Sequence, residues 1–165
     1  MLPSYIQVDP ERDLVLQRVI DVPPRLVWRC WTEPELLKQW FTPSPWRTVH
    51  CEINLRPGGV FHTVMESPEG ERVPGSSCYL EIVENQLLVW TNALHPGYRP
   101  SNEDPGPTSF FTAVVSLEPH GTGTKFTAIA VHKDAPSAAA HVEMGFHEGW
   151  GAGLDQLVAL AKTLQ

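Results

Sequence analysis

The stretch that decides the fold is His141–Leu154, which has the sequence HVEMGFHEGWGAGL. It contains two histidines, two glutamates and four glycines, so a catalytic loop, a metal site and a helix all come into question. A helix start precedes it, because Pro136 and Ser137 are followed by three alanines and Ser137 suits the N-cap position. No proline follows up to Gln165. We therefore predict one helix from about residue 137 to about residue 164.

An apolar stripe with helical spacing supports this prediction. Glycine lowers helix stability by about 1 kcal/mol relative to alanine, so the glycines of this helix need a packing reason. Gly145, Gly149 and Gly153 are spaced by four, and we interpret them as a smooth strip that lets the helix lie close to another element. The stripe recurs every three or four residues and is expected to face the core: Phe146, Trp150, Gly153, Leu157, Leu160 and Leu164.

The N-terminal half of the predicted helix also carries polar residues where packing is expected. Glu143, His147, Trp150 and Leu154 would share one face of an unbroken helix. A buried carboxylate and a buried imidazole need hydrogen-bond partners. This end of the helix is therefore predicted to border a polar cavity.

A metal site is the competing interpretation of the same residues. His147 begins an HExxH-like sequence, but Gly151 occupies the position of the second histidine. Glu143 and His147 could supply two metal ligands, with His132 or His62 as a third. We favour a hydrogen-bonded histidine–glutamate pair that lines a cavity, and we predict no bound metal and no cofactor.

The chain upstream of the helix predicts mainly antiparallel strands. A strand at 14–20 is followed by two short helices, PPRLVWRCW with Pro24 in its first turn and EPELLKQWF with Thr32 as cap. Turn signals then separate strand-like segments, and short connections of this kind join antiparallel neighbours. These segments are 48–55, 59–66, 76–83, 86–94, 109–118 and 124–132.

One connection, His95–Thr108, is long and contains four prolines. Connections of this length without secondary structure are uncommon and often functional. A lid over a cavity and a merely mobile loop are the two interpretations.

Composition limits the class of protein. The chain has 165 residues and a formal charge of −7, with no run of basic residues, which argues against nucleic-acid binding. No apolar stretch approaches the roughly 20 residues that cross a bilayer, and the N-terminus lacks the features of a signal peptide. Three scattered cysteines predict neither disulfides nor a zinc site. We expect a single cytoplasmic domain over residues 1–165, with its core at about 14–164.

The order of these elements and four of the segments resemble the START-like superfamily. The segments are VIDVPPRLVWRCWTEPELLKQWF, LRPGGVF, LLVWTNAL and GFHEGWGAGLDQLVAL, and the similarity is strongest to the branch related to activators of heat-shock protein 90 ATPase. The resemblance implies an α+β helix-grip fold, in which a curled antiparallel sheet of six or seven strands surrounds a long C-terminal helix. It also implies a hydrophobic cavity between sheet and helix.

Three functions stay open. The first is binding of a small hydrophobic, lipid-like or polyketide-like molecule, as the family implies. The second is a cyclase, aromatase or hydrolase reaction with His147 as acid or base and Glu143 orienting it. The third is a co-chaperone or another interaction module, although 165 residues leave no room for the additional chaperone-binding domain of eukaryotic members. A homodimer is also open.

Strand alternation decides which aromatic side chains face the predicted cavity. Because the register is uncertain by one residue, His62, Tyr79 and Phe110 are the replacements for the strand residues chosen here. The predicted ligand-binding residues are Trp40, Phe61, Trp90, Phe111, Glu143, His147 and Trp150.

Overall fold

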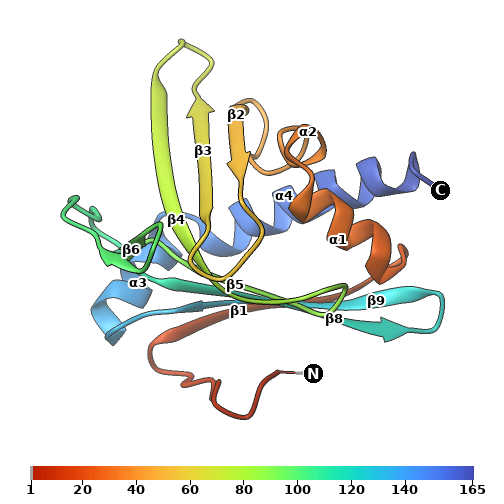
Figure 1. Ribbon diagram of the computed structural model, residues 1–165, viewed down its shortest axis with the longest axis horizontal. Coiled ribbons are helices and arrows are strands. Elements are labelled where there is room, and N and C mark those ends of the chain that lie inside the picture. The colour runs from red at the N-terminus through yellow and green to blue at the C-terminus, as the bar shows by residue number, and fades with distance from the viewer. Residues whose placement is uncertain (1) are drawn as a thin grey trace.

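The structure is a computed structural model that describes residues 2–165 (Figure 1). Its main sheet is antiparallel and has seven strands in the order β1-β9-β8-β5-β4-β3-β2, which confirms the predicted fold class. The two very short strands β6 and β7 pair only with each other. The strands are β1 (Asp13–Ile20), β2 (Arg47–Ile53), β3 (Val60–Glu66), β4 (Arg72–Val83), β5 (Leu87–Thr91), β6 (Leu94–His95), β7 (Arg99–Pro100), β8 (Thr112–His120) and β9 (Gly123–Val131).

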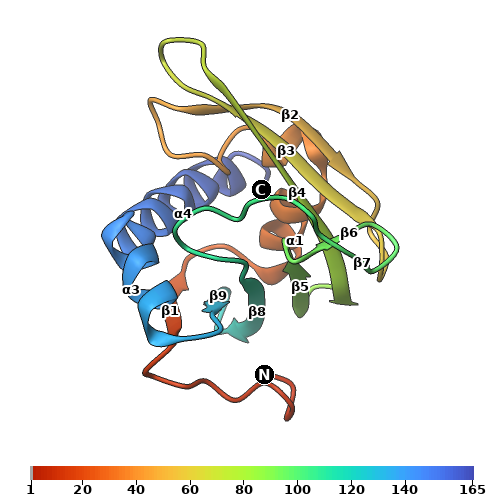
Figure 2. The same cartoon turned by 90° about the vertical axis from the view of Figure 1, so that its left-hand side faces the viewer.

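Four helices complete the fold. They are α1 (Pro24–Thr32), α2 (Pro34–Leu37), α3 (Ala135–Glu143) and α4 (Phe146–Lys162). Viewed from the end, the sheet curls, with β2, β3 and β4 on one side and β1, β8 and β9 on the other, and α4 lies along the opening of the curl (Figure 2). None of the helices in residues 2–165 is long and apolar enough to span a membrane.

The two short helices begin as their prolines predict. Pro24 occupies the first turn of α1, where its missing N–H group costs no hydrogen bond. The cap of α2 differs from the prediction: Glu33, not Thr32, is its N-cap, and the Thr32 hydroxyl donates back to the Trp28 carbonyl at 2.8 Å. Both helices close the sheet at one end, and their buried side chains are Leu26, Val27, Trp28, Cys30, Trp31 and Leu37.

The prediction of a single C-terminal helix is wrong, because the helix is interrupted between α3, which ends at Glu143, and α4, which begins at Phe146. Gly145 has a φ of +94°, a left-handed conformation that residues with a side chain rarely adopt, and it stands at the N-cap of α4. The start was also misassigned: Asp134 is the N-cap of α3, and its carboxylate accepts a hydrogen bond from the Ser137 backbone N–H at 2.9 Å. The break turns α3 away from the axis of α4 (Figure 1).

The three glycines interpreted as one strip have three different roles. Gly145 makes the break. Gly153 is buried against residues 40–41, where a Cβ would lie 3.7 Å from the Trp40 carbonyl oxygen and 3.8 Å from that of Phe41, which is ordinary van der Waals contact. Gly149 is different, because a Cβ there would meet no atom within 4 Å. The interpretation as one packing strip is therefore wrong: of the three glycines only Gly153 packs against a neighbouring segment, and a Cβ would fit there.

The sheet buries apolar side chains on both faces. The larger cluster fills the inside of the curl and includes the aromatic side chains of α1, Trp40, Phe61 and Trp90. The smaller cluster lies on the outer face, where Leu2 and Ile6 of the N-terminal segment cover it. Figure 1 shows this segment running beneath β1 and β8. The buried members of the outer cluster are Leu87, Val89, Val114 and Ile129.

Candidate functional site

A cavity of about 360 Å³ separates the N-terminal half of α4 from the inside of the curled sheet. Among residues 2–165, no aspartate, glutamate, lysine or arginine lines it, and His141 is the only titratable side chain that does. Its walls are mainly aromatic, with Trp31, Trp40, Phe41, Phe111, Phe126, Phe146 and Trp150. Mostly apolar walls with very few polar groups are typical of small-molecule sites.

The aromatic wall opposite α4 is rigidly packed. Trp31 contacts Trp40 edge to face, with ring centroids 4.6 Å apart, and also contacts Phe41 at 5.9 Å. The Trp40 indole N–H donates to the Cys30 carbonyl at 2.9 Å, which fixes the orientation of that ring. Such edge-to-face pairs are favoured by the charge distribution of aromatic rings. The wall is therefore formed before any ligand arrives.

The predicted ligand-binding residues fall into three groups. Trp40, Phe111 and Trp150 line the cavity. Phe61 and Trp90 are buried one layer behind it, where Phe61 packs against Phe41 at 5.6 Å and Trp90 against Trp31 at 5.3 Å. These two rings support the wall and do not form it.

Glu143 and His147, the third group, lie at the surface and do not line the cavity. The expectation that they face the interior fails for a geometric reason. Phe146 is buried and sets the inward face of α4, and His147 follows it by one residue, which is roughly 100° around a helix. Glu143 belongs to α3, on the other side of the break, so it does not share a face with His147.

A histidine pair takes the place of that predicted polar pair. His132, directly after β9, and His141, in α3, place Nε2 and Nδ1 3.0 Å apart. His132 is only 3% exposed, and His141 is half-buried and reaches the cavity. From the sequence, His132 is expected only as a possible metal ligand, and no role is expected for His141. No periodicity or motif connects the two residues, because they lie on different elements.

The surroundings of both histidines favour the neutral imidazole over the charged imidazolium. Burial lowers the pKa of His141 to about 4, and the neighbouring His132 lowers it further in the same direction. Burial also lowers the pKa of His132, although Asp13, the Thr108 backbone carbonyl and Asp134 oppose that change. At neutral pH the pair is therefore uncharged, and one ring nitrogen donates the shared proton to the other.

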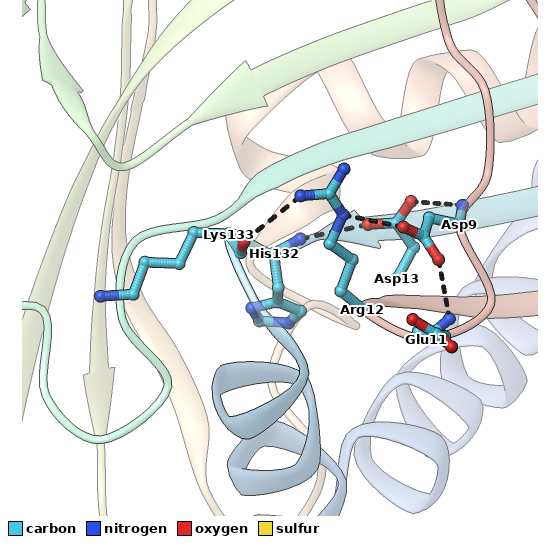
Figure 3. A network of polar contacts seen from close by, with 6 residues as sticks. All are labelled: Asp9, Glu11, Arg12, Asp13, His132 and Lys133. Atoms are coloured by element: carbon cyan, nitrogen blue, oxygen red, sulfur yellow. Dashed lines mark hydrogen bonds and ion pairs between the residues drawn. The ribbon is translucent and has the colours of Figure 1, made fainter.

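A polar network at the N-terminal segment holds the backbone of His132 in place (Figure 3). The backbone N–H of His132 donates to Asp13 Oδ1 at 3.3 Å. Arg12 donates through Nη1 to the Lys133 carbonyl at 3.4 Å and through Nε to Asp9 Oδ2 at 2.9 Å. Figure 3 shows the His132 ring pointing away from this network, toward α3. The N-terminal segment thus positions one half of the histidine pair.

A second cavity, of about 490 Å³, lies on the other side of the pair and is lined by Pro105, Ser109, Phe110, Phe111 and His132 among others. Phe111 lines both cavities and contacts both histidine rings, at 5.6 Å from His132 and 5.0 Å from His141. Pro105, in the connection His95–Thr108, thus lines the second cavity. The mobility of this connection stays a prediction.

No metal-binding group of three or more His, Cys, Asp or Glu side chains occurs within the described part of the chain. The three cysteines are unpaired. Burial raises the pKa of the Cys30 and Cys51 thiols to about 11, so both are poor nucleophiles at neutral pH. The histidine pair therefore provides the main polar group next to the inner cavity, and His141 is the member that lines it.

Comparisons with known proteins agree with the fold. The family described as "Activator of Hsp90 ATPase homolog 1-like protein" matches residues 21–162. No curated protein matches significantly. Among solved structures, protein NE0264 from Nitrosomonas europaea is 48% identical with a TM-score of 0.89, over 94% of this chain and 97% of that one.

More distant structures share the fold alone. Protein Ms6760 from Mycobacterium smegmatis is 22% identical with a TM-score of 0.74, over 91% of this chain and 90% of that one. A protein from Rhodobacter sphaeroides is 17% identical with a TM-score of 0.80, over 96% of this chain and 99% of that one.

Proposed function

The chain belongs to the family of activator of Hsp90 ATPase homolog 1-like proteins, and on that premise we propose that it binds a small apolar molecule in the inner cavity. The family is known for ligand binding, which fits a hydrophobic ligand here. The cavity itself is the observation that carries the proposal. Its volume of about 360 Å³ lies within the range of small-molecule sites, roughly 300–1,000 Å³.

Two features of the cavity argue for a ligand over loose packing. The aromatic rings on the sheet side already pack against one another, so they cannot move in to fill the gap without losing those contacts. On the helix side, Gly149 has no side chain where one would fit. The space is thus bounded by packed aromatic rings on the sheet side and by a glycine on the helix side. A flat apolar molecule would fill it.

Gly149 also offers a way to block the cavity. A leucine side chain at this position would enter open space without a backbone clash and would occupy part of the volume. Gly151 provides the matched control, because it lies on the same helix, also has nothing within 4 Å of a Cβ, and does not line the cavity. Both substitutions raise helix propensity equally.

The test measures binding of the neutral, polarity-sensitive dye prodan by its fluorescence. We expect wild type and Gly151→Leu to bind prodan, and Gly149→Leu to bind it at least tenfold more weakly, because a filled pocket must expel either the side chain or the dye. Native mass spectrometry of freshly purified protein would reveal a ligand retained from the cell. Equal prodan binding by both variants, or none by wild type, would contradict the proposal.

Catalysis by His147 and Glu143 stays a hypothesis with less support. Both side chains are exposed and neither lines the cavity. A ligand in the cavity would therefore contact His141 before it contacted either of them. Co-chaperone activity and a homodimer stay hypotheses. The cytoplasm, the expected compartment, is compatible with three unpaired cysteines.

A further inference from the structure

We infer that Phe111, together with His132 and His141, forms a wall between the two cavities, and that this wall limits the inner cavity to compact apolar molecules. Long-chain lipids are thereby excluded from full burial. This inference rests on the proposed function and adds a limit on the size of the ligand. Phe111 is the residue that sets the limit.

The wall is defined by the residues that line each cavity. Phe111 is the only residue in 2–165 that lines both, whereas His141 lines the inner cavity and His132 the second one. The two histidines are joined by the 3.0 Å contact between Nε2 and Nδ1, so they bridge the space between the cavities. The Phe111 ring contacts both imidazoles, at 5.6 and 5.0 Å. At Phe111 the wall is therefore one residue thick.

The backbone of Phe111 is held in place by the neighbouring strand. Its N–H donates to Asn92 Oδ1 at 2.9 Å, and its carbonyl accepts a hydrogen bond from the Thr91 hydroxyl at 3.1 Å. The next residue, Thr112, begins β8 and pairs with Thr91 of β5. The histidines behind the ring form one hydrogen bond whichever of the two facing nitrogens is the donor. The wall is thus part of the folded protein before any ligand arrives.

The volume in front of the wall determines what can be buried. The inner cavity, at about 360 Å³, is near the lower end of the range for small-molecule sites, roughly 300–1,000 Å³. A chain that fills it cannot continue into the second cavity, because Phe111 closes that direction. Further methylene groups stay in water and add no affinity, since the gain comes from removing apolar surface from water. Compact molecules are buried completely, and long chains are not.

Removal of the Phe111 ring should join the two cavities. The second cavity has about 490 Å³ behind the wall, so one substitution gives a bound chain access to this additional space. Truncation of a large apolar side chain leaves much of the vacated volume empty, because the surrounding structure relaxes only partly. Phe111→Ala should therefore accept longer chains than wild type, and this change in length preference is specific to a wall.

A series of 1-alkanols from 1-butanol to 1-decanol tests the inference by displacement of prodan. For short alkanols we expect the affinity of both proteins to rise about fourfold with each methylene group. In wild type the rise should stop at the chain that fills the inner cavity. In Phe111→Ala it should continue, so that 1-decanol binds this variant about tenfold more tightly than wild type or better.

Phe110→Ala is the matched control. It removes the same atoms at the neighbouring position, which is also half-buried, but Phe110 lines only the second cavity. Its affinity should stop rising at the same chain length as that of wild type. Urea denaturation shows whether each variant is folded. If Phe111→Ala does not fold, Phe111→Leu replaces it and should move the limit in the same direction.

The outcomes separate the wall from the cavity. The inference is overturned if wild type and the Phe111 variant show the same length dependence, even with a uniform loss of affinity in the variant. A shift of equal size in Phe110→Ala, or an affinity of wild type that rises up to 1-decanol, also overturns it. In these cases the cavity stands as long as Gly149→Leu still blocks prodan. If prodan never binds wild type, the proposed function itself fails.

Discussion

The two halves of α4 differ in what they pack against. In the C-terminal half, Leu157 and Ala161 are completely buried in the inner core. In the N-terminal half, Gly149 and Trp150 border an open cavity. One continuous helix therefore closes the core at one end and leaves a gap at the other. The gap arises where large aromatic rings on the sheet side meet glycine, which fills no space.

The two halves of α4 are therefore expected to serve different purposes, stability in the C-terminal half and ligand binding in the N-terminal half. Side chains in the C-terminal half should contribute to the free energy of unfolding, because removing them leaves a hole in a filled core. Side chains in the N-terminal half should contribute mainly to ligand affinity. The predictions below test this difference, beginning with the largest expected effect.

Leu157→Ala should lower the free energy of unfolding by about 2–5 kcal/mol, the range for removing a fully buried leucine side chain. Leu157 is 0% exposed and belongs to the inner core. Urea denaturation followed by tryptophan fluorescence measures the change. Gly149→Leu, the substitution in the other half, should not lower stability. A loss below 0.5 kcal/mol for Leu157→Ala, a threshold of about the size seen for surface substitutions, would remove the contrast between the halves.

Gly153→Leu should lower the free energy of unfolding by about 1–3 kcal/mol, the usual effect of overpacking. The Trp40 and Phe41 carbonyl oxygens lie 3.7 and 3.8 Å from a Cβ at this position, so a longer side chain pushes α4 away from that segment. Gly149→Leu again serves as the control, four residues earlier on the same helix. Equal stability of the two variants would show that α4 does not approach residues 40–41 closely.

Acid should weaken the fold through His141, in the cavity half. An unfolded histidine titrates near pH 6.5, whereas burial lowers the pKa of His141 in the folded protein to about 4. Between these values the unfolded chain binds a proton that the folded chain does not, so stability falls as the pH drops from 6.5 to 4 and this contribution then levels off. Because His141 is only half-buried, solvent screening limits the loss to about 1–2 kcal/mol.

The control for the pH effect is His141→Gln, which does not titrate and can still hydrogen-bond to His132. Urea denaturation at several pH values between 7 and 4 should show a shallower loss of stability in this variant than in wild type. His132, whose pKa is also lowered by burial, contributes in the same direction in both proteins. Parallel curves for the two proteins would mean that His141 is not held neutral by its surroundings.

His147→Ala should have the smallest effect. The side chain is exposed and does not line the cavity, so we expect changes within about 0.5 kcal/mol in stability and no change in prodan affinity. His141→Ala is the matched comparison and should weaken binding of prodan, because the His141 side chain lines the cavity. If His147→Ala strongly weakened prodan binding and His141→Ala did not, His147 and not His141 would be the histidine that contacts the ligand.

Local patterns in the sequence were sufficient for much of the fold. Strand alternation and the short turns predicted seven antiparallel segments, and Pro24 correctly predicted the start of α1. These features depend on neighbours within a few residues, so the sequence contains their causes. The aromatic residues Trp40, Phe111 and Trp150 could be placed at the cavity on the same basis.

The polar part of the site could not be predicted in this way. Periodicity gives the angles between side chains on one unbroken helix, but it does not say that the left-handed Gly145 interrupts the helix or which angle faces the sheet. His147 and Glu143 were assigned to the interior for that reason. The contact between His132 and His141 joins the end of a strand to a separate helix, and no spacing rule covers it.

The sequence by itself determined the α+β class, the order of the elements, the antiparallel sheet and the apolar stripe of the last helix, because each follows from local propensity and side-chain periodicity. Only the tertiary structure decided where the helix breaks, which glycine leaves space, and which histidine borders the cavity. Those outcomes depend on how close separate elements approach one another. That distance is set by the packing of whole surfaces, here the large rings of Trp31 and Trp40 against the glycine-rich half of α4.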